Sequence, residues 1–296
     1  MKYHHIPVML SEVVKHLAVK PGGIYIDCTL GGAGYTLELA KRVGPKGRVL
    51  ALDMDIAAIS NAKEKIAKQA IENVILVQEN FKNIAPVFHE YFKKEELVDG
   101  IVFDLGLSSF QLSDKKRSFS FQNDVPLDMA FGKKAEKQTV EIINNYKLLD
   151  LTEIFREYGE EKNAYKIAKA IVLERKKRKI ETTQDLVDII VKQYPKRAYY
   201  KIHPATKVFQ ALRIETNQEF NNLKTALADI SKILKFKGRI VVVSFHSGED
   251  RIVKQFFKNN EEIMPIVKKP VVASENEVAS NPRARSAKLR SGIKVV

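Results

Sequence analysis

Three aspartates, Asp27, Asp53 and Asp104, each end an apolar run of strand length. If the three runs are parallel strands, their carboxyl ends meet at one edge of a sheet, where ligands bind in open α/β folds. Asp55 would add a fourth acid beside Asp53. Like charges repel strongly in a cleft of low dielectric constant, so such an edge suits a cationic ligand and disfavours a pyrophosphate.

A glycine-rich turn follows the first apolar run. The run begins at Ile24 and breaks into Gly31-Gly32-Ala33-Gly34-Tyr35, after which a helical pattern starts. This is typical of a buried parallel strand that leads into a tight turn whose backbone amides face a ligand. Asp53, at the end of the second run, could bind the two hydroxyls of a ribose. The two segments together predict a nucleoside pocket.

The spacing of the glycines indicates which nucleoside fits. The dinucleotide fingerprint needs a third glycine for close helix packing, but Leu37 stands at that place. S-adenosylmethionine (SAM) carries a sulfonium, an ammonium, a ribose and an adenine, so acidic strand ends suit it. A glycine turn beside solvated carboxylates, with no ligand, stays an alternative because loop glycines are common.

The apolar runs also predict the scaffold that positions these residues. Runs of strand length recur at residues 49–53, 74–78, 100–104 and 238–245, and helical patterns, including one over 88–97, lie between them. Strands that alternate with helices imply right-handed crossovers and a parallel sheet. The predicted fold class is therefore α/β.

The pattern of apolar residues changes between about Ser113 and Ala205. Strand signals stop there, and apolar residues recur at helical spacing, with Thr182 or Thr183 as the N-cap of one helix. A helical stretch over 206–234 then returns to the sheet. We expect an all-helical insert over residues 113–205, within a domain formed by residues 1–112 and 206–296.

The formal net charge of +14 indicates a polyanionic partner, nucleic acid before membrane. Between residues 162 and 201 there are twelve Lys or Arg and four Asp or Glu, including the run Arg175-Lys176-Lys177-Arg178-Lys179. Tyr194, Tyr199 and Tyr200 could stack on bases there. Residues 279–296 hold five basic residues and no acid, so this tail is a second candidate for RNA contact. A solvated charged surface or a lysine-rich composition is the alternative.

Cysteine and histidine are scarce. Cys28 is the one cysteine, which excludes a disulfide framework and a cysteine-rich zinc site, and His4 and His5 lack metal-ligand spacing, so no metal site is predicted. His246 follows the last strand and could orient a substrate or be a hydrogen-bonded structural residue. The start has no apolar segment of signal-peptide length and no charge-free run could span a bilayer, so we expect a cytoplasmic protein.

A SAM site on a basic protein suggests methyl transfer to nucleic acid. Methylation of a pyrimidine C5 needs a cysteine nucleophile, and Cys28 lies within a strand. Transfer to an amine needs only alignment and hydrogen-bond acceptors, which polar residues after the fourth strand would supply. Asp104 is our candidate catalytic residue.

A series of ordered segments resembles a known family nearly from end to end. The segments are His5–Leu10, Asp27–Gly31, Asp104–Leu112, Pro126–Met129, Tyr158–Glu161, His203–Thr206, Phe209–Ile214, Ser244–Ser247 and Asn281–Ser286. They resemble the bacterial small-subunit (16S) rRNA cytosine-N4 methyltransferases, called RsmH or MraW.

The resemblance implies a Rossmann-like SAM-dependent methyltransferase domain, interrupted by a helical domain that binds RNA. It implies methylation of the exocyclic N4 of a decoding-region cytidine, with small-subunit rRNA or the assembled small subunit as partner. The cofactor contacts that it implies fall on Ala33, Gly34, Tyr35, Asp53, Phe81, Asp104 and Gln111.

Three positions depart from the family pattern. The glycine loop usually ends Gly-Gly-His, whereas here it ends Ala33-Gly34-Tyr35, which affects a side-chain contact at Tyr35. Gly248 stands where leucine is common, and Ser118 replaces the glycine of an Arg-Gly-Phe segment. Two other readings stay open: a nicotinamide-dependent oxidoreductase, which the loop argues against, and a non-catalytic RNA-binding protein, in which acidic strand ends would have no purpose.

Overall fold

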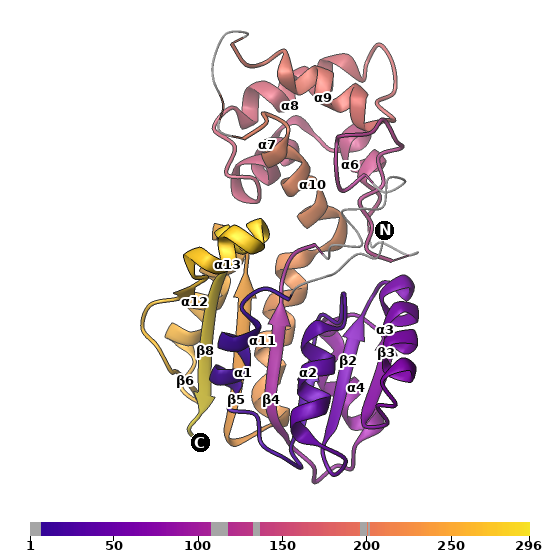
Figure 1. The fold of residues 1–296 in the computed structure, drawn as a ribbon. Coiled ribbons are helices and arrows are strands. Elements are labelled where there is room, and N and C mark those ends of the chain that lie inside the picture. The colour runs from indigo at the N-terminus through magenta and orange to yellow at the C-terminus, as the bar shows by residue number, and fades with distance from the viewer. Residues whose placement is uncertain (1–6, 108–117, 133–136, 196–199, 201) are drawn as a thin grey trace. The chain divides into compact units, whose positions relative to one another are not determined.

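The computed structural model describes residues 7–107, 118–132, 137–195, 200 and 202–296 (Figure 1). Contacts between residues divide the chain into two units. The first combines Met1–Ser109 with Phe220–Val296, and the second is Phe110–Glu219. No helix in the described ranges is long and apolar enough to cross a membrane.

A mostly parallel sheet forms the centre of the first unit. Its parallel strands are β1 (Ile24–Asp27), β2 (Arg48–Asp53), β3 (Val74–Gln78), β4 (Val98–Asp104) and β5 (Leu234–Ser244), in the order β3-β2-β1-β4-β5. The crossovers between them contain helices, which confirms the predicted α/β, Rossmann-like fold. The central strands β1 and β4 are neighbours, with Asp27 paired to Val102, and β4 is in turn paired to β5, with Asp104 opposite Val243.

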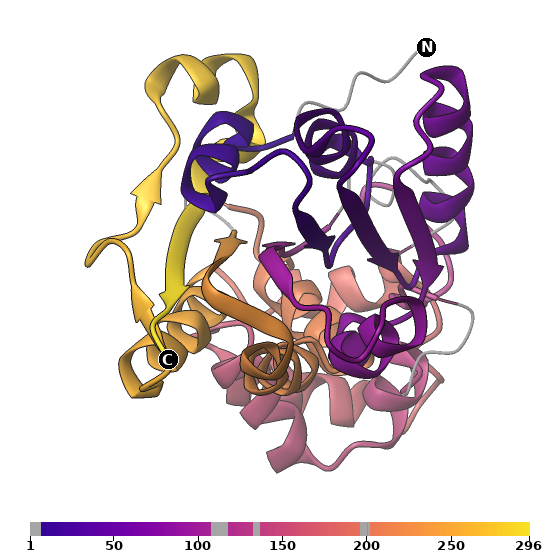
Figure 2. The ribbon, with the colours of Figure 1, turned by 90° about the horizontal axis from the view of Figure 1, so that it is seen from below.

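Helices cover both faces of this sheet (Figure 2). One face packs on α1 (Leu10–Leu17) and α2 (Gly34–Val43), and the other on α4 (Ile84–Tyr91), α11 (Glu219–Ile233) and α12 (Ser247–Asn259). Successive strand residues point to opposite faces, so Tyr25 belongs to the first of these cores and Ile26 to the second. A smaller cluster joins α3 (Ile56–Lys68) to the sheet through Ile59 and Ala62. The helix expected at 88–97 begins and ends earlier, and Pro86 lies in its first turn, where a missing N–H costs little.

The C-terminal segment is part of the sheet. Strand β8 (Lys288–Lys294) pairs antiparallel with β5, and β6 (Ile263–Pro265) and β7 (Val271–Val272) pair with β8. Helices α13 (Glu275–Ser280) and η2 (Pro282–Ser286) precede β8. This strand has no clear signal in the sequence, because β8 interleaves charged residues with few apolar ones.

Basic residues of this segment have partners within the protein, as Arg290, Lys288 and Lys294 show. Arg290 Nε donates to Asp250 Oδ1 at 2.7 Å, and Lys288 Nζ lies 3.4 Å from Asp250 Oδ2. Lys294 Nζ donates to the Ser231 carbonyl oxygen at 2.6 Å. These three residues stabilise the edge of the sheet, and the expectation that the tail contacts RNA stays a prediction.

The second unit is helical in its described part. It contains α6 (Thr139–Asn145), α7 (Leu148–Glu157), α8 (Ala164–Glu174), α9 (Thr183–Val191) and α10 (Thr206–Asn217). Thr182 caps α9 through a reciprocal pair of bonds with Asp185. The unit extends beyond the expected boundary at 205 because Val208 and Leu212 of α10 join its core. The stretch expected as one helix over 206–234 is broken at Gln218, whose φ is 51°.

Candidate active site

The glycine loop between β1 and α2 is held from two sides. Gly31 N donates to Asp53 Oδ2 at 2.8 Å, and Lys65 Nζ, from α3, donates to the Gly32 carbonyl oxygen at 2.8 Å. Gly31 and Ala33 have positive φ values of 46° and 65°, and Ala33 is the N-cap of α2. This turn leaves the first N–H groups of α2 at the carboxyl edge of the sheet, where they favour an anionic group.

Gly34 allows the N-terminal segment to lie against the loop. A Cβ at Gly34 would lie 2.0 Å from Pro7 Cγ, so any other residue would displace Pro7. The space opened by this glycine is therefore filled by Pro7. Pro7 belongs to the first of the segments on which the family resemblance rests, and this residue packs directly on the glycine loop.

The Tyr35 side chain is used inside the protein. Its hydroxyl donates to the Val8 carbonyl oxygen, and the residue is 4% exposed. Burial, reinforced by the nearby Asp104 and Asp27, raises the pKa of Tyr35 well above its usual value. Only the Tyr35 backbone is then free to contact a ligand, which gives a physical reason why tyrosine is accepted where the family has histidine.

Asp27 is a fully buried carboxylate that organises the start of α2. Its Oδ2 accepts from Thr36 Oγ1 at 2.6 Å and its Oδ1 accepts from Thr29 N at 3.1 Å. Burial raises the pKa of Asp27 to about 6, although these hydrogen bonds oppose the shift. Both carboxylate oxygens are committed within the protein, so Asp27 contributes negative charge to the edge and shapes the loop.

Asp53 accepts backbone hydrogen bonds on both oxygens. Gly31 N donates to Oδ2 and Asp55 N donates to Oδ1, each at 2.8 Å. Each carboxylate oxygen can accept a second bond, so two ribose hydroxyls can still be bound. Burial raises the pKa of Asp53 to about 6. Asp55 itself is buried and caps α3 by accepting from Ala57 N at 3.0 Å, so it does not belong to the ligand edge.

An apolar wall follows β3. Phe81 begins the short helix η1 (Phe81–Asn83) and meets Phe103 edge to face, with ring centroids 5.6 Å apart. Asn80 starts this turn by accepting from Lys82 N at 2.9 Å. Phe81 is partly buried, so part of its surface is available for a flat apolar ligand such as adenine.

Among the three acids at the strand ends, Asp104 receives the fewest hydrogen bonds from the described part of the protein. Its backbone N donates to Thr29 Oγ1 at 2.7 Å, which joins the ends of β1 and β4. Its Oδ1 atom is buried and has no hydrogen-bond partner in the part of the chain that the structure describes. Burial, followed by the charges of Asp27 and Glu249, raises the pKa of Asp104 well above its usual value. An unsatisfied buried acceptor costs about 1–3 kcal/mol, so its retention indicates a ligand that donates to it.

His246 lies at the end of the neighbouring strand β5 and is the N-cap of α12. Its Nδ1 accepts from Glu249 N at 3.4 Å, and Glu249 Oε2 accepts from Phe245 N at 2.9 Å. His246 Nε2 is buried and lies 3.2 Å from the carboxylate oxygen Glu249 Oε1, yet it has no hydrogen-bond partner among the described residues.

The other two departures from the family pattern also have structural reasons. A Cβ at Gly248 would lie 2.5 Å from Phe220 Cζ and 3.3 Å from His246 Nδ1, so Phe220 occupies the space of a larger side chain. Ser118, in the second unit, is fully buried, and its Oγ accepts from Asp128 N at 2.7 Å. A glycine at 118 has no atom for this bond.

The structure brings Asp27, Asp53 and Asp104 together at the carboxyl edge of the sheet. Gln111, Ser108 and Ser109 lie outside the described residues. Sequence reasoning missed Thr29 and Lys65, which position Asp104 and the loop. Thr29 stood inside a family segment, whereas Lys65 had no signal beyond its place on a helix. Among the described residues there is no group of three or more His, Cys, Asp or Glu that could hold a metal.

The basic run in the second unit is less free than its sequence indicates. Arg175 donates to the carbonyl oxygens of Ile143 and Tyr146 at 2.7 and 2.6 Å, so it holds a turn between two helices. Lys177 pairs with Glu174, Arg178 with Asp185 and Lys179 with Glu181. These pairs are exposed and weak, so the lysines can still meet phosphates. Arg175 is a structural residue, which corrects its assignment to the candidate RNA contacts.

The aromatic residues near this run are also engaged. Tyr194 and Tyr200 meet edge to face, with ring centroids 5.3 Å apart, and Tyr199 lies outside the described residues.

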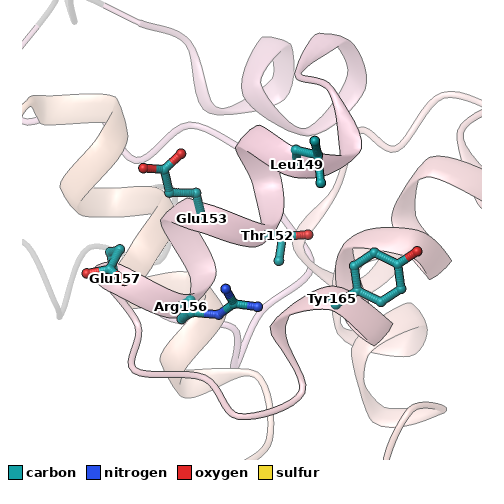
Figure 3. A pocket seen from close by; sticks show the side chains of 6 residues that line it. All are labelled: Leu149, Thr152, Glu153, Arg156, Glu157 and Tyr165. Carbon is teal, nitrogen blue, oxygen red and sulfur yellow. The ribbon is translucent and has the colours of Figure 1, made fainter.

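A separate cavity of about 360 Å³ lies between α7 and α8 (Figure 3). It is lined by Leu149, Thr152, Glu153, Arg156, Glu157 and Tyr165. None of the predicted site residues lines it.

Comparison with known proteins identifies a matching family model and relatives of similar sequence. The family model described as the MraW methylase family matches residues 2–295. The ribosomal RNA small subunit methyltransferase H of Clostridioides difficile is 41% identical over 100% of both chains, and that of Carboxydothermus hydrogenoformans is 42% identical over 100% of this chain and 99% of that protein. A solved rRNA methylase from Streptococcus thermophilus aligns over 99% of this chain and 100% of that chain, with 12% identity and a TM-score of 0.46.

Proposed function

The chain belongs to the MraW methylase family, and we propose on this premise that it transfers a methyl group from SAM to the exocyclic N4 of a cytidine in the decoding region of small-subunit rRNA. The observation that carries the proposal is Asp104 Oδ1, a buried acceptor without a partner among the described residues. A non-catalytic RNA-binding protein gains nothing from such an atom.

The first unit holds the groups that fit SAM. Asp53 accepts from the ribose hydroxyls, Phe81 packs against the adenine, and the N–H groups at the start of α2 meet the carboxylate. The acidic edge matches the sulfonium and the ammonium. Because Asp53 and Asp104 have raised pKa values in the free protein, a cationic ligand stabilises their ionised forms.

When bound, SAM supplies an electrophilic methyl group. The contribution of the protein is to hold the cytosine amine in line with it and to keep its lone pair directed at it. A carboxylate is the expected acceptor for a cytosine N4–H. Asp104 accepts one N4–H and takes that proton when the N4–methyl bond forms and the sulfur–methyl bond breaks, which leaves S-adenosylhomocysteine. Thr29 fixes the backbone from which Asp104 extends. A neutral amine attacks without a covalent intermediate on the enzyme, so the buried Cys28 needs no role.

The helical insert contributes affinity for RNA. Lys176, Lys177 and Lys179 are exposed and lie together after α8, where they attract phosphates by counterion release. The substrate is small-subunit rRNA, free or within the assembled subunit, and the reaction takes place in the cytoplasm, where rRNA and SAM meet.

Two measurements test this function. Mass mapping of nucleosides in rRNA from cells with and without the protein should reveal one cytidine that loses an N4 methyl group. Isothermal titration should show binding of SAM and no binding of NAD. Methylation of carbon 5, or an unchanged nucleoside map, would contradict the proposal.

A further inference from the structure

The first unit contains two buried side-chain atoms without a hydrogen-bond partner among the described residues, and both lie at the same edge of the sheet. They are Asp104 Oδ1 and His246 Nε2. The turn after β4 touches the turn after β5, since a Cβ at Gly106 would lie 3.3 Å from Phe245 Cδ2. His246 Nε2 lies 3.2 Å from Glu249 Oε1 without a hydrogen bond. Native proteins rarely leave buried polar atoms without a hydrogen bond, so two of them at one edge of the sheet point to a ligand that contacts both.

The cap of α12 decides which of the His246 nitrogens carries the proton. Nδ1 accepts from Glu249 N, so Nδ1 presents a lone pair. A neutral imidazole with an acceptor at Nδ1 has its hydrogen on Nε2, and this assignment follows from the hydrogen-bond pattern. Phe220, whose ring centroid lies 5.8 Å from that of His246, packs against the ring. His246 therefore presents a fixed donor, and Asp104 presents an acceptor.

We propose that His246 is a specificity-determining residue whose Nε2–H donates to N3 of the target cytosine while Asp104 accepts from N4. This inference rests on the proposed methylation of N4. Cytosine presents an N4–H donor beside an N3 acceptor, which matches the pair. Uracil presents an O4 acceptor beside an N3–H donor, so both contacts become repulsive. Adenine presents the same donor and acceptor pattern at N6 and N1, so only its larger size distinguishes it from cytosine at this site.

The variants that test this role separate the cap from the donor. In His246→Asn the amide oxygen replaces Nδ1 as a cap acceptor, since Asn is a good N-cap, but no group replaces Nε2–H. In His246→Gln the longer amide keeps a donor near the Nε2 position. Both variants should keep the SAM affinity of the wild type, because His246 contacts the base.

The experiment measures binding of small-subunit rRNA that carries cytidine or 3-deazacytidine, which has C–H in place of N3, at the mapped position. Filter binding with S-adenosylhomocysteine present should show about a tenfold loss for the wild type when N3 is removed, the value of one hydrogen bond to a buried donor. His246→Asn should bind cytidine about tenfold more weakly and be insensitive to N3. His246→Gln should recover most of the sensitivity.

Two results would overturn the inference. Equal sensitivity to N3 in the wild type and His246→Asn would show that another group reads N3. A wild type that is insensitive to N3 would exclude the contact without reference to any variant. Loss of SAM binding or of cytidine methylation in the wild type would instead contradict the proposed function, so the two failures are distinguishable.

Discussion

Replacing Asp104 by asparagine should make the free protein more stable and the enzyme slower. The carboxylate oxygen Oδ1 is buried without a partner in the described part of the chain, and burial raises the pKa of Asp104. Asparagine keeps the shape and removes the ionisable group. Because asparagine cannot ionise, it avoids the cost of a buried carboxylate without a partner, which is worth about 1–3 kcal/mol of unfolding free energy at a pH where the unfolded aspartate is charged. In the enzyme, loss of the charge and of one acceptor should slow the single-turnover rate about 10²-fold or more at saturating SAM.

The stability gain should depend on pH in a defined direction. Below the unfolded pKa of an aspartate, near 4, the group is protonated in both states and costs nothing. Above it, the unfolded chain releases a proton that the folded chain retains, so the stability of the wild type falls as pH rises toward the raised folded pKa. The advantage of Asp104→Asn should therefore be small at pH 4 and larger at pH 7.

Asp99→Asn is the matched control. Asp99 lies near the opposite end of the same strand, and its carboxylate accepts from Ile24 N at 2.9 Å and from Lys235 Nζ at 2.8 Å. Its replacement should lower stability and leave the saturated rate unchanged. Urea unfolding at both pH values, with single-turnover methylation, measures all of these quantities. If Asp104→Asn is less stable than the wild type, the unpaired-acceptor reasoning is refuted, and a raised SAM dissociation constant with a normal rate would assign Asp104 to cofactor binding alone.

Three further outcomes are expected. Asp53→Ala should weaken SAM binding by about 1.5–3 kcal/mol for each of two charge-assisted hydrogen bonds, and unchanged affinity in isothermal titration would remove the ribose assignment. The affinity of the wild type for SAM should fall as pH drops through about 6, because the pKa of Asp53 is raised to that value and its protonated form accepts fewer bonds; a flat profile between pH 5 and 7.5 would contradict this. Joint replacement of Lys176, Lys177 and Lys179 by glutamine should flatten the salt dependence of rRNA binding without changing SAM affinity or melting temperature. The control Arg175→Gln should lower the melting temperature because two carbonyl oxygens lose their donor.

Local patterns in the sequence were enough to predict the scaffold. The third strand was predicted at residues 74–78 and is Val74–Gln78 in the structure, and Asp53 and Asp104 end their strands as expected. Neighbouring residues determine the periodicity of a strand or a helix, and the alternation of strands with helices along the chain implies a parallel sheet. The acidic edge and the choice of SAM over a dinucleotide could therefore be derived before any coordinates.

The partners of individual side chains were decided only by the tertiary structure. Arg175 looked like part of a basic surface, yet it binds carbonyl oxygens 29 and 32 positions away in sequence. The basic tail proved to include a strand because Asp250 and β5 lie beside it. The lack of a hydrogen-bond partner for Asp104 Oδ1 among the described residues likewise has no local signature, whereas the cap of α12 joins residues only three positions apart. Hydrogen bonding and burial depend on atoms brought together from distant parts of the chain. Periodicity therefore predicts the position of a side chain on its helix or strand, but not the atoms that it contacts.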